Sequence, residues 1–128
     1  MVEAGSDREQ AARESDAREQ LLAAGAADLP RPPWLHRSQP PSAVDLIRFA
    51  LWRTHTSDVD EEDLVAALTL LPAARAEVDQ VEAALLFTAR AQGLAWSRIS
   101  RAMGLGSAQA AQQRFDRVTD RVEHRGGA

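Results

Sequence analysis

The apolar residues of this chain recur at helical spacing over its last two thirds, and proline and glycine divide them into separate segments. Residues 43–55 are apolar on more than one side, which is typical of a central helix or of a helix in a subunit interface. Residues 58–71 and 72–92 each carry a narrower apolar stripe. This pattern predicts an all-α protein, a helical bundle.

The ends of these predicted helices coincide with residues that start or stop helices. Ser42 followed by Asp45 fits an N-terminal cap, and so do the polar residues 56–58. Pro72 fits the first turn of a new helix, and Gly93 fits the left-handed residue that ends it. The inward stripe that we expect for this last helix comprises Ala74, Val78, Val81, Leu85, Leu86 and Ala89.

Two further helices are predicted at 95–103 and 107–125, with Gly104 in the turn between them. The residues expected to face inward are Trp96, Ile99 and Met103 in the first of these helices and Ala108, Ala111, Phe115, Val118 and Val122 in the second. At 100° per residue, the five in the second helix fall within roughly 80° of one another, so one face of that helix is buried.

The first third of the chain differs in composition. Residues 1–28 are mostly polar with a thin apolar stripe, which predicts a tail that is disordered or a marginal helix. Such a tail could bind a protein partner. Residues 29–42 contain five of the six prolines and form a predicted linker, whose Trp34 we expect to dock on the domain that follows. The helical domain then comprises residues 43–125.

Charge is distributed unevenly along the chain, although its formal net value is only -4. Residues 1–71 hold 7 Arg against 13 acidic residues, a balance of -6, and residues 72–128 hold 8 Arg against 6, a balance of +2. From Gly93 onward the balance is +3. The positive end of the chain coincides with the last two predicted helices, which points to nucleic acid.

Several classes of protein have no support in the residues. The chain has no Cys and three isolated His, and none of the common hydrolase, metalloprotease or nucleotide-binding motifs occurs, so we expect neither an enzyme nor a metal or cofactor. The acidic residues 58–63 lack the spacing of a calcium-binding loop and fit an exposed helix start. No apolar run approaches the ~18 residues of a membrane span, and no signal peptide is apparent. We therefore expect a cytoplasmic protein.

The segment GLAWSRISRAMGLGSAQAAQQRFDRV carries a family resemblance. It is similar to the helix-turn-helix of bacterial DNA-binding proteins of the sigma-factor region-4-like and small-regulator types, in which an aromatic residue precedes an Ile, a Leu-Gly-like pair ends the first helix and a Ser opens the second. The resemblance extends over roughly residues 81–125 and places the motif at 95–125. It implies a supporting helix at 95–103 and a recognition helix from Ser107.

The far side of the predicted recognition helix carries amide and guanidinium groups. The residues that we expect to contact double-stranded DNA are Arg98, Ser107, Gln109, Ala110, Gln113, Arg114, Arg117 and Arg121. The two glutamines suit adenine edges, and the three arginines of this helix suit phosphate or guanine. Ala110 is small enough to contact a thymine methyl, while Ser107 and Arg98 would hold the DNA backbone.

The sequence thus predicts a DNA-binding protein, a transcriptional regulator or a nucleoid-associated factor. The apolar face of the last helix also has the spacing of a coiled-coil seam, so we expect a homodimer that reads two half-sites. The alternative is a protein-interaction module, such as an adaptor or a sigma-binding regulator, that uses the same helix pair without binding DNA.

Overall fold

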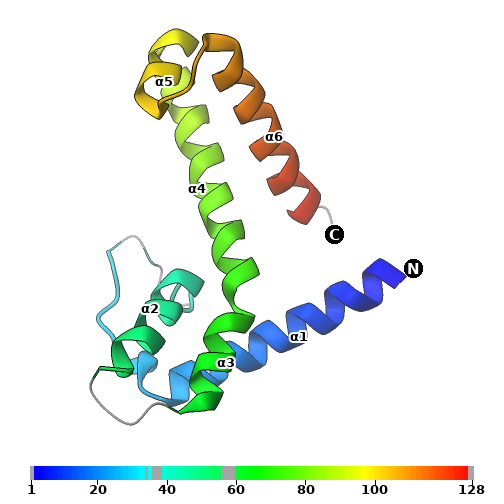
Figure 1. Cartoon of the computed structure of the whole chain (residues 1–128), viewed down its shortest axis with the longest axis vertical. Helices are drawn as coiled ribbons and strands as arrows, with labels where there is room; N and C mark the ends of the chain where they lie inside the picture. The colour runs from blue at the N-terminus through cyan, green and yellow to red at the C-terminus, as the bar shows by residue number, and fades with distance from the viewer. Residues whose placement is uncertain (1, 34, 36–38, 56–59, 127–128) are drawn as a thin grey trace. The chain divides into compact units, whose positions relative to one another are not determined.

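The structure of the chain, a computed structural model, describes residues 2–33, 35, 39–55 and 60–126. Its regular elements in these residues are all helical, which confirms the all-α prediction. They are α1 (Val2–Ala23), the short 3-10 helix η1 (Ala26–Asp28), α2 (Ala43–Arg53), α3 (Glu61–Thr69), α4 (Leu71–Ala91), α5 (Trp96–Met103) and α6 (Ala108–Gly126) (Figure 1). None of the described helices is long and apolar enough to cross a membrane.

The chain divides into two compact units, Met1–Arg75 and Ala76–Ala128, which we call the N-terminal unit and the C-terminal unit. The sequence predicts a linker that ends at residue 42 and one domain that begins at residue 43. The structure instead divides the chain between Arg75 and Ala76. Helix α4 begins in the N-terminal unit, and most of its length belongs to the C-terminal unit.

Helix α1 is part of the core of the N-terminal unit. Its last two turns bury Ala17 and Leu21, and Leu21 is fully inaccessible. The side chain of Gln20 donates a hydrogen bond to Oδ1 of Asp63 in α3 at 3.1 Å, and Arg18 donates to the carbonyl oxygen of Pro41 at 3.1 Å. Helix α1 therefore contributes Ala17 and Leu21 to the core of this unit, while Leu22 is only partly buried.

Helix α2 packs against both α1 and α3 and begins where the sequence predicts. The hydroxyl of Ser42 accepts a hydrogen bond from the backbone N–H of Asp45 at 3.1 Å. Leu46 and Phe49 are buried, while Leu51 and Trp52 near the end of the helix are exposed. In the preceding proline segment, Leu29 packs against this core. Trp34 lies outside the described residues.

Helix α3 starts at a cap that differs from the predicted one. Residues 56–58 lie outside the described residues, and the carboxylate of Asp60 accepts from the N–H of Glu62 at 3.0 Å. The acidic helix start is exposed except for Asp63, which is buried and paired with Gln20. The prediction of a fully exposed acidic cluster is therefore wrong for Asp63.

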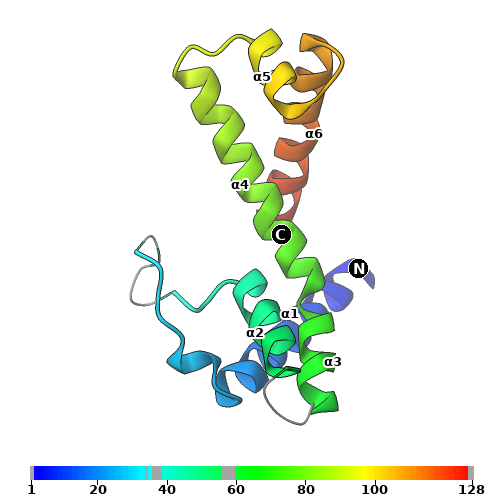
Figure 2. The same ribbon diagram turned by 60° about the vertical axis from the view of Figure 1, so that its left-hand side comes forward.

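The C-terminal unit consists of α4, α5 and α6. Helices α4 and α6 run antiparallel, and α5 lies where α4 ends and α6 begins (Figures 1 and 2). Its core contains Leu86 of α4, Ile99 of α5, and Ala111 and Val118 of α6. Trp96 and Phe115 are partly buried against this core, so most residues of the predicted inward faces of α5 and α6 do face inward. Two residues that were predicted to face inward, Met103 and Ala108, are exposed.

Of the predicted inward stripe of α4, Leu86 and Ala89 face the core of this unit, whereas Val78, Val81 and Leu85 do not. Leu86 is 4% exposed, whereas the stripe residues Val78, Val81 and Leu85 are 58%, 67% and 67% exposed. The side of α4 toward α6 carries Asp79 and Glu82 instead, and both carboxylates pair with arginines of α6. These ion pairs join α4 to α6 on the side where Leu86 is buried, and periodicity alone does not reveal them.

Candidate nucleic-acid interface

The turn between α5 and α6 is closed by a glycine in the left-handed conformation. Gly104 has φ 72° and ψ 23°, where a side chain would be strained, as the sequence predicts. The backbone N–H of Leu105 donates to the carbonyl oxygen of Ser100 at 2.9 Å, and the buried Ser100 hydroxyl donates back to the carbonyl of Leu105 at 3.1 Å. These bonds fix where α5 ends.

The start of α6 is capped by Ser107. Its hydroxyl accepts a hydrogen bond from the backbone N–H of Ala110 at 3.1 Å, which satisfies one of the free amide groups of the first turn. This bond gives Ser107 a structural role besides the predicted contact with a DNA backbone. The capped turn points the first amides of α6, and the positive end of its dipole, to the surface.

Aromatic contacts hold α5 between α4 and α6. The Trp96 and Phe115 rings lie 5.8 Å apart at a tilt of 46°. The guanidinium of Arg90 in α4 lies 4.9 Å from the centre of the Trp96 ring, and it donates to the carbonyl oxygen of Leu94 at 2.9 Å. Arg90 and Trp96 therefore brace the α5–α6 pair against α4.

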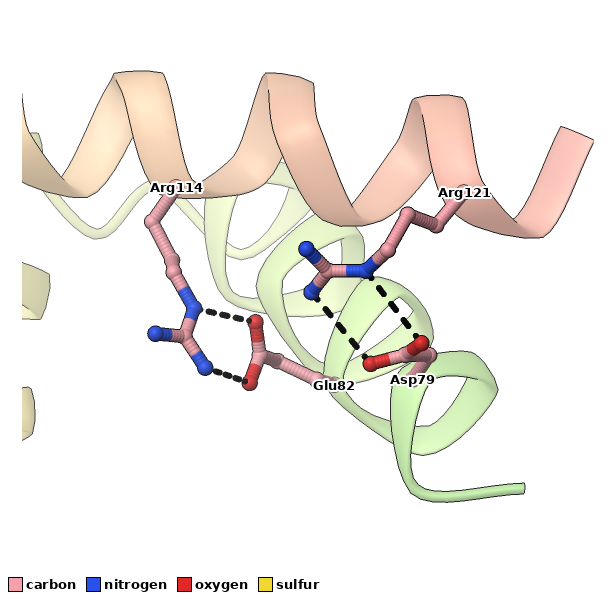
Figure 3. Close-up of polar contacts among 4 residues, drawn as sticks. All are labelled: Asp79, Glu82, Arg114 and Arg121. Carbon is pink, nitrogen blue, oxygen red and sulfur yellow. Dashed lines mark hydrogen bonds and ion pairs between the residues drawn. The ribbon is translucent and has the colours of Figure 1, made fainter. Parts of the chain in front are cut away.

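Arg114 and Arg121 turn toward α4 rather than away from the unit (Figure 3). Nε and Nη2 of Arg114 donate to the two Glu82 oxygens at 2.9 and 3.0 Å. The same atoms of Arg121 donate to the two Asp79 oxygens at 3.3 Å each. Both pairs are bidentate, the geometry in which a guanidinium binds a carboxylate most specifically.

These pairs change the role of two predicted DNA contacts. The hydrogen bond to Glu82 and the negative charge of Glu82 raise the pKa of Arg114 above its ordinary value. The charges of Arg114 and Arg121 are each balanced by a carboxylate of α4. We therefore assign both residues to the packing of α6 on α4.

The remaining predicted contacts lie on the open side of the helix pair. Arg98, Gln109, Gln113 and Arg117 are exposed, as the sequence predicts. Ala110 is half-buried, on the side of α6 toward Arg114 and Arg121, which leaves part of its methyl group accessible.

One exposed cation escaped the prediction. Arg101 lies three residues after Arg98 in α5, so the two side chains share one face of this short helix. The spacing itself is visible in the sequence. Between Glu82 and Asp116 the chain contains four arginines and no acidic residue. Arg114 pairs with Glu82 of α4 and Arg90 lies over the Trp96 ring, whereas Arg98 and Arg101 are exposed on α5.

The open side of α6 has two parts of different charge. Its first two turns carry glutamines and no acidic group, whereas Asp116, Asp120 and Glu123 are exposed on the later turns. Phosphate would be attracted to the first part and repelled by the second. In the part of the chain that the structure describes, no three His, Asp or Glu side chains gather as a metal site would require.

Comparison of the chain with protein-family models, with curated proteins and with solved structures finds no match.

Proposed function

We propose that the C-terminal unit binds double-stranded DNA through α5 and the first two turns of α6, as a helix-turn-helix. The observation that carries this proposal is the open polar surface at the start of α6. There Gln109 and Gln113 of α6 are exposed, as are the cations Arg98 and Arg101 of α5, and no acidic residue lies between Glu82 and Asp116 in the sequence. The other side of α6 is fixed in the core, so the helix can present these groups without rearranging.

The chemistry of this surface suits a major groove. A glutamine side chain offers one donor and one acceptor, which match N6 and N7 of adenine. The cations and the capped amides at the start of α6 suit phosphate oxygens. The phosphate contacts position the protein on DNA, and the contacts of the glutamines with base edges supply sequence preference.

The acidic later turns of α6 set the orientation that we propose. Asp116, Asp120 and Glu123 would be repelled by phosphates, so α6 enters the groove with its N-terminal end and leaves its C-terminal turns outside. Arg117 lies at the border between the two parts and suits a phosphate at the groove edge. The role that follows is transcriptional regulation or nucleoid organisation.

The proposal is tested on DNA selected from a random-sequence library with the full chain. Fluorescence anisotropy is then measured for the wild type, for Gln113→Ala and for the matched control Gln80→Ala, an exposed glutamine of α4 that is not part of the proposed surface. We expect Gln113→Ala to weaken discrimination at one base pair by about 1–3 kcal/mol and Gln80→Ala to leave it unchanged.

Two results would contradict the proposal. The first is the absence of any DNA complex at low salt, where phosphate contacts are strongest. The second is a complex whose affinity and sequence preference respond equally to the two glutamine substitutions.

A further inference from the structure

Helix α2 and the proline-rich segment 29–41 border a cavity of about 410 Å³ within the N-terminal unit. The α2 side of this cavity is formed by Asp45, Arg48, Phe49 and Trp52. They occupy positions i, i+3, i+4 and i+7, so helical spacing puts the four side chains on one face of the helix. Cavities of roughly 300–1,000 Å³ with mostly apolar walls are typical of small-molecule sites.

The wall opposite α2 is mostly apolar and is held in place at several points. It consists of Leu29, Pro30, Arg31, Pro32, Leu35 and Pro41. Arg18 of α1 donates a hydrogen bond to the carbonyl oxygen of Pro41 at 3.1 Å, and Arg31 donates to the carbonyl oxygen of Gln39. The backbone N–H of Leu35 donates to the carbonyl oxygen of Pro32 at 3.1 Å. Because proline rings also restrict the backbone, this wall does not need a ligand to form it.

The ring of Phe49 is the buried aromatic part of the cavity lining, and its neighbours hold it in place. Phe49 is 6% exposed, and the guanidinium of Arg53 lies 5.8 Å from the centre of its ring. Gly25 lies so close that a Cβ atom there would come within 3.3 Å of the ring. The Trp52 ring lies 6.2 Å from the Phe49 ring and is 58% exposed, so it borders both the cavity and the solvent. A flat ligand would therefore meet two aromatic rings and several prolines.

The charges of the cavity lining differ in sign from those of the unit around it. Residues 1–75 hold 8 Arg against 13 acidic residues, a balance of -5. The lining holds Arg31 and Arg48 against Asp45, a balance of +1. Arg48 is exposed on the same helix face as Trp52, so its guanidinium is accessible beside the apolar part of the cavity.

We propose that this site, which we call the α2 cavity, binds a small aromatic anion, a molecule with a flat apolar ring system and one acidic group. The rings lie against Trp52 and the prolines, and the acidic group pairs with Arg48. Asp45 lies one turn before Arg48 and would repel a second acidic group, so the site favours a ligand with a single negative charge. Apolar walls supply most of the affinity, and the single cation sets the orientation of the ligand.

This site goes beyond the proposed contact with DNA. The α2 cavity belongs to the N-terminal unit, whereas the α5–α6 surface belongs to the C-terminal unit. Neither proposal requires the other.

The first test uses two fluorescent probes that differ only in charge. The full chain is titrated with anilinonaphthalene sulfonate, an aromatic anion, and with phenylnaphthylamine, the same ring system without the sulfonate. We expect saturable binding of both probes. Arg48→Gln should weaken binding of the anion about three- to fivefold, and Asp45→Asn should strengthen it by a similar factor, because both charges are close to solvent. Neither variant should change binding of the neutral probe.

The matched control for charge is Arg8→Gln, which removes an exposed arginine of α1 outside the cavity. It should leave binding of both probes unchanged. Circular dichroism of each variant checks that its helices are intact.

The second test concerns the apolar part of the site. Trp52→Ala should weaken binding of both probes about tenfold, because it removes an aromatic ring from the lining. The matched control is Leu51→Ala, at a neighbouring residue of α2 that is 57% exposed and does not line the cavity, and it should change neither affinity. In the wild type, nuclear Overhauser effects between the naphthalene protons and the rings of Phe49 and Trp52 should locate the bound probe independently of any variant.

Three results would overturn this proposal. The first is the absence of saturable binding of the anion to the wild type, including the case in which binding occurs only after Trp34→Ala, which would mean that the chain itself occupies the cavity. The second is an affinity for the anion that is the same in Arg48→Gln, Asp45→Asn and the wild type. The third is a bound probe without nuclear Overhauser effects to Phe49 and Trp52.

The two proposals fail separately. A chain that binds selected DNA but neither probe removes the α2 cavity as a ligand site and leaves the α5–α6 interface, while a chain that binds the anion but no DNA does the reverse.

Discussion

Replacing Leu21 by Ala should lower the free energy of unfolding of the N-terminal unit by about 2–5 kcal/mol. Leu21 is fully inaccessible and belongs to the cluster that joins α1 to α2 and α3. Truncating Leu21 removes its apolar contacts with α2 and α3. It also leaves a cavity, because the surrounding helices relax only partially into the volume of the removed side chain. Urea unfolding followed by circular dichroism, with amide exchange of α3 as the local probe, measures the change.

The matched control is Leu68→Ala, which removes the same atoms from an exposed position of α3. We expect it to change stability by less than about 0.5 kcal/mol. If Leu21→Ala were as mild as Leu68→Ala, α1 would be a loosely attached segment and not a part of the core of the N-terminal unit.

Removing the three open cations Arg98, Arg101 and Arg117 together should have the largest effect on DNA binding. Each lost phosphate contact lowers the slope of log affinity against log salt concentration by about 0.9, so the triple alanine variant should lose about 2.7 in slope. Between 50 and 200 mM salt, its affinity should then fall about 40-fold less than that of the wild type. Anisotropy titrations over this range give both slopes.

The control for this prediction removes the same charge from the N-terminal unit. Arg8, Arg13 and Arg75 are exposed there, and their joint replacement by Ala should leave the salt slope unchanged. Equal slopes for the two triple variants would mean that phosphate contacts do not come from the α5–α6 surface.

The sequence was most informative where local chemistry sets the structure. Pro72 in the first turn of α4, the left-handed Gly93 and Gly104 and the cap at Ser107 all occur where their own backbone preferences place them. These signals depend on a few neighbouring residues, so they could be read without knowing what packs against each helix. The helices of the C-terminal unit were therefore well predicted.

The sequence was least informative where distant residues decide between two faces. Periodicity placed Val78, Val81 and Leu85 in the inward stripe of α4, but it did not show that these three residues are exposed. That outcome depends on Asp79 and Glu82, whose arginine partners lie 42 and 32 residues away in the chain. The same pairs turn Arg114 and Arg121, two of the predicted DNA contacts, toward α4.

The contribution of α1 to the core was hard to predict for a related reason. Its sequence contains only two leucines among polar residues and alanines, which predicts weak burial. An alanine such as Ala17 counts little in an apolar stripe, yet it allows close helix packing, and Leu21 is then fully covered by elements that come later in the chain.

Mapping the DNA contact by NMR tests the central claim most directly. The uniformly ¹⁵N-labelled chain is titrated with a selected duplex, and shifts of backbone amides and of glutamine side-chain amides are followed. We expect the largest shifts in α5 and the first two turns of α6, including the side-chain amides of Gln109 and Gln113, and small shifts in α1 to α3. Shifts confined to the N-terminal unit, with the Gln109 and Gln113 amides unmoved, would contradict DNA binding through the α5–α6 pair.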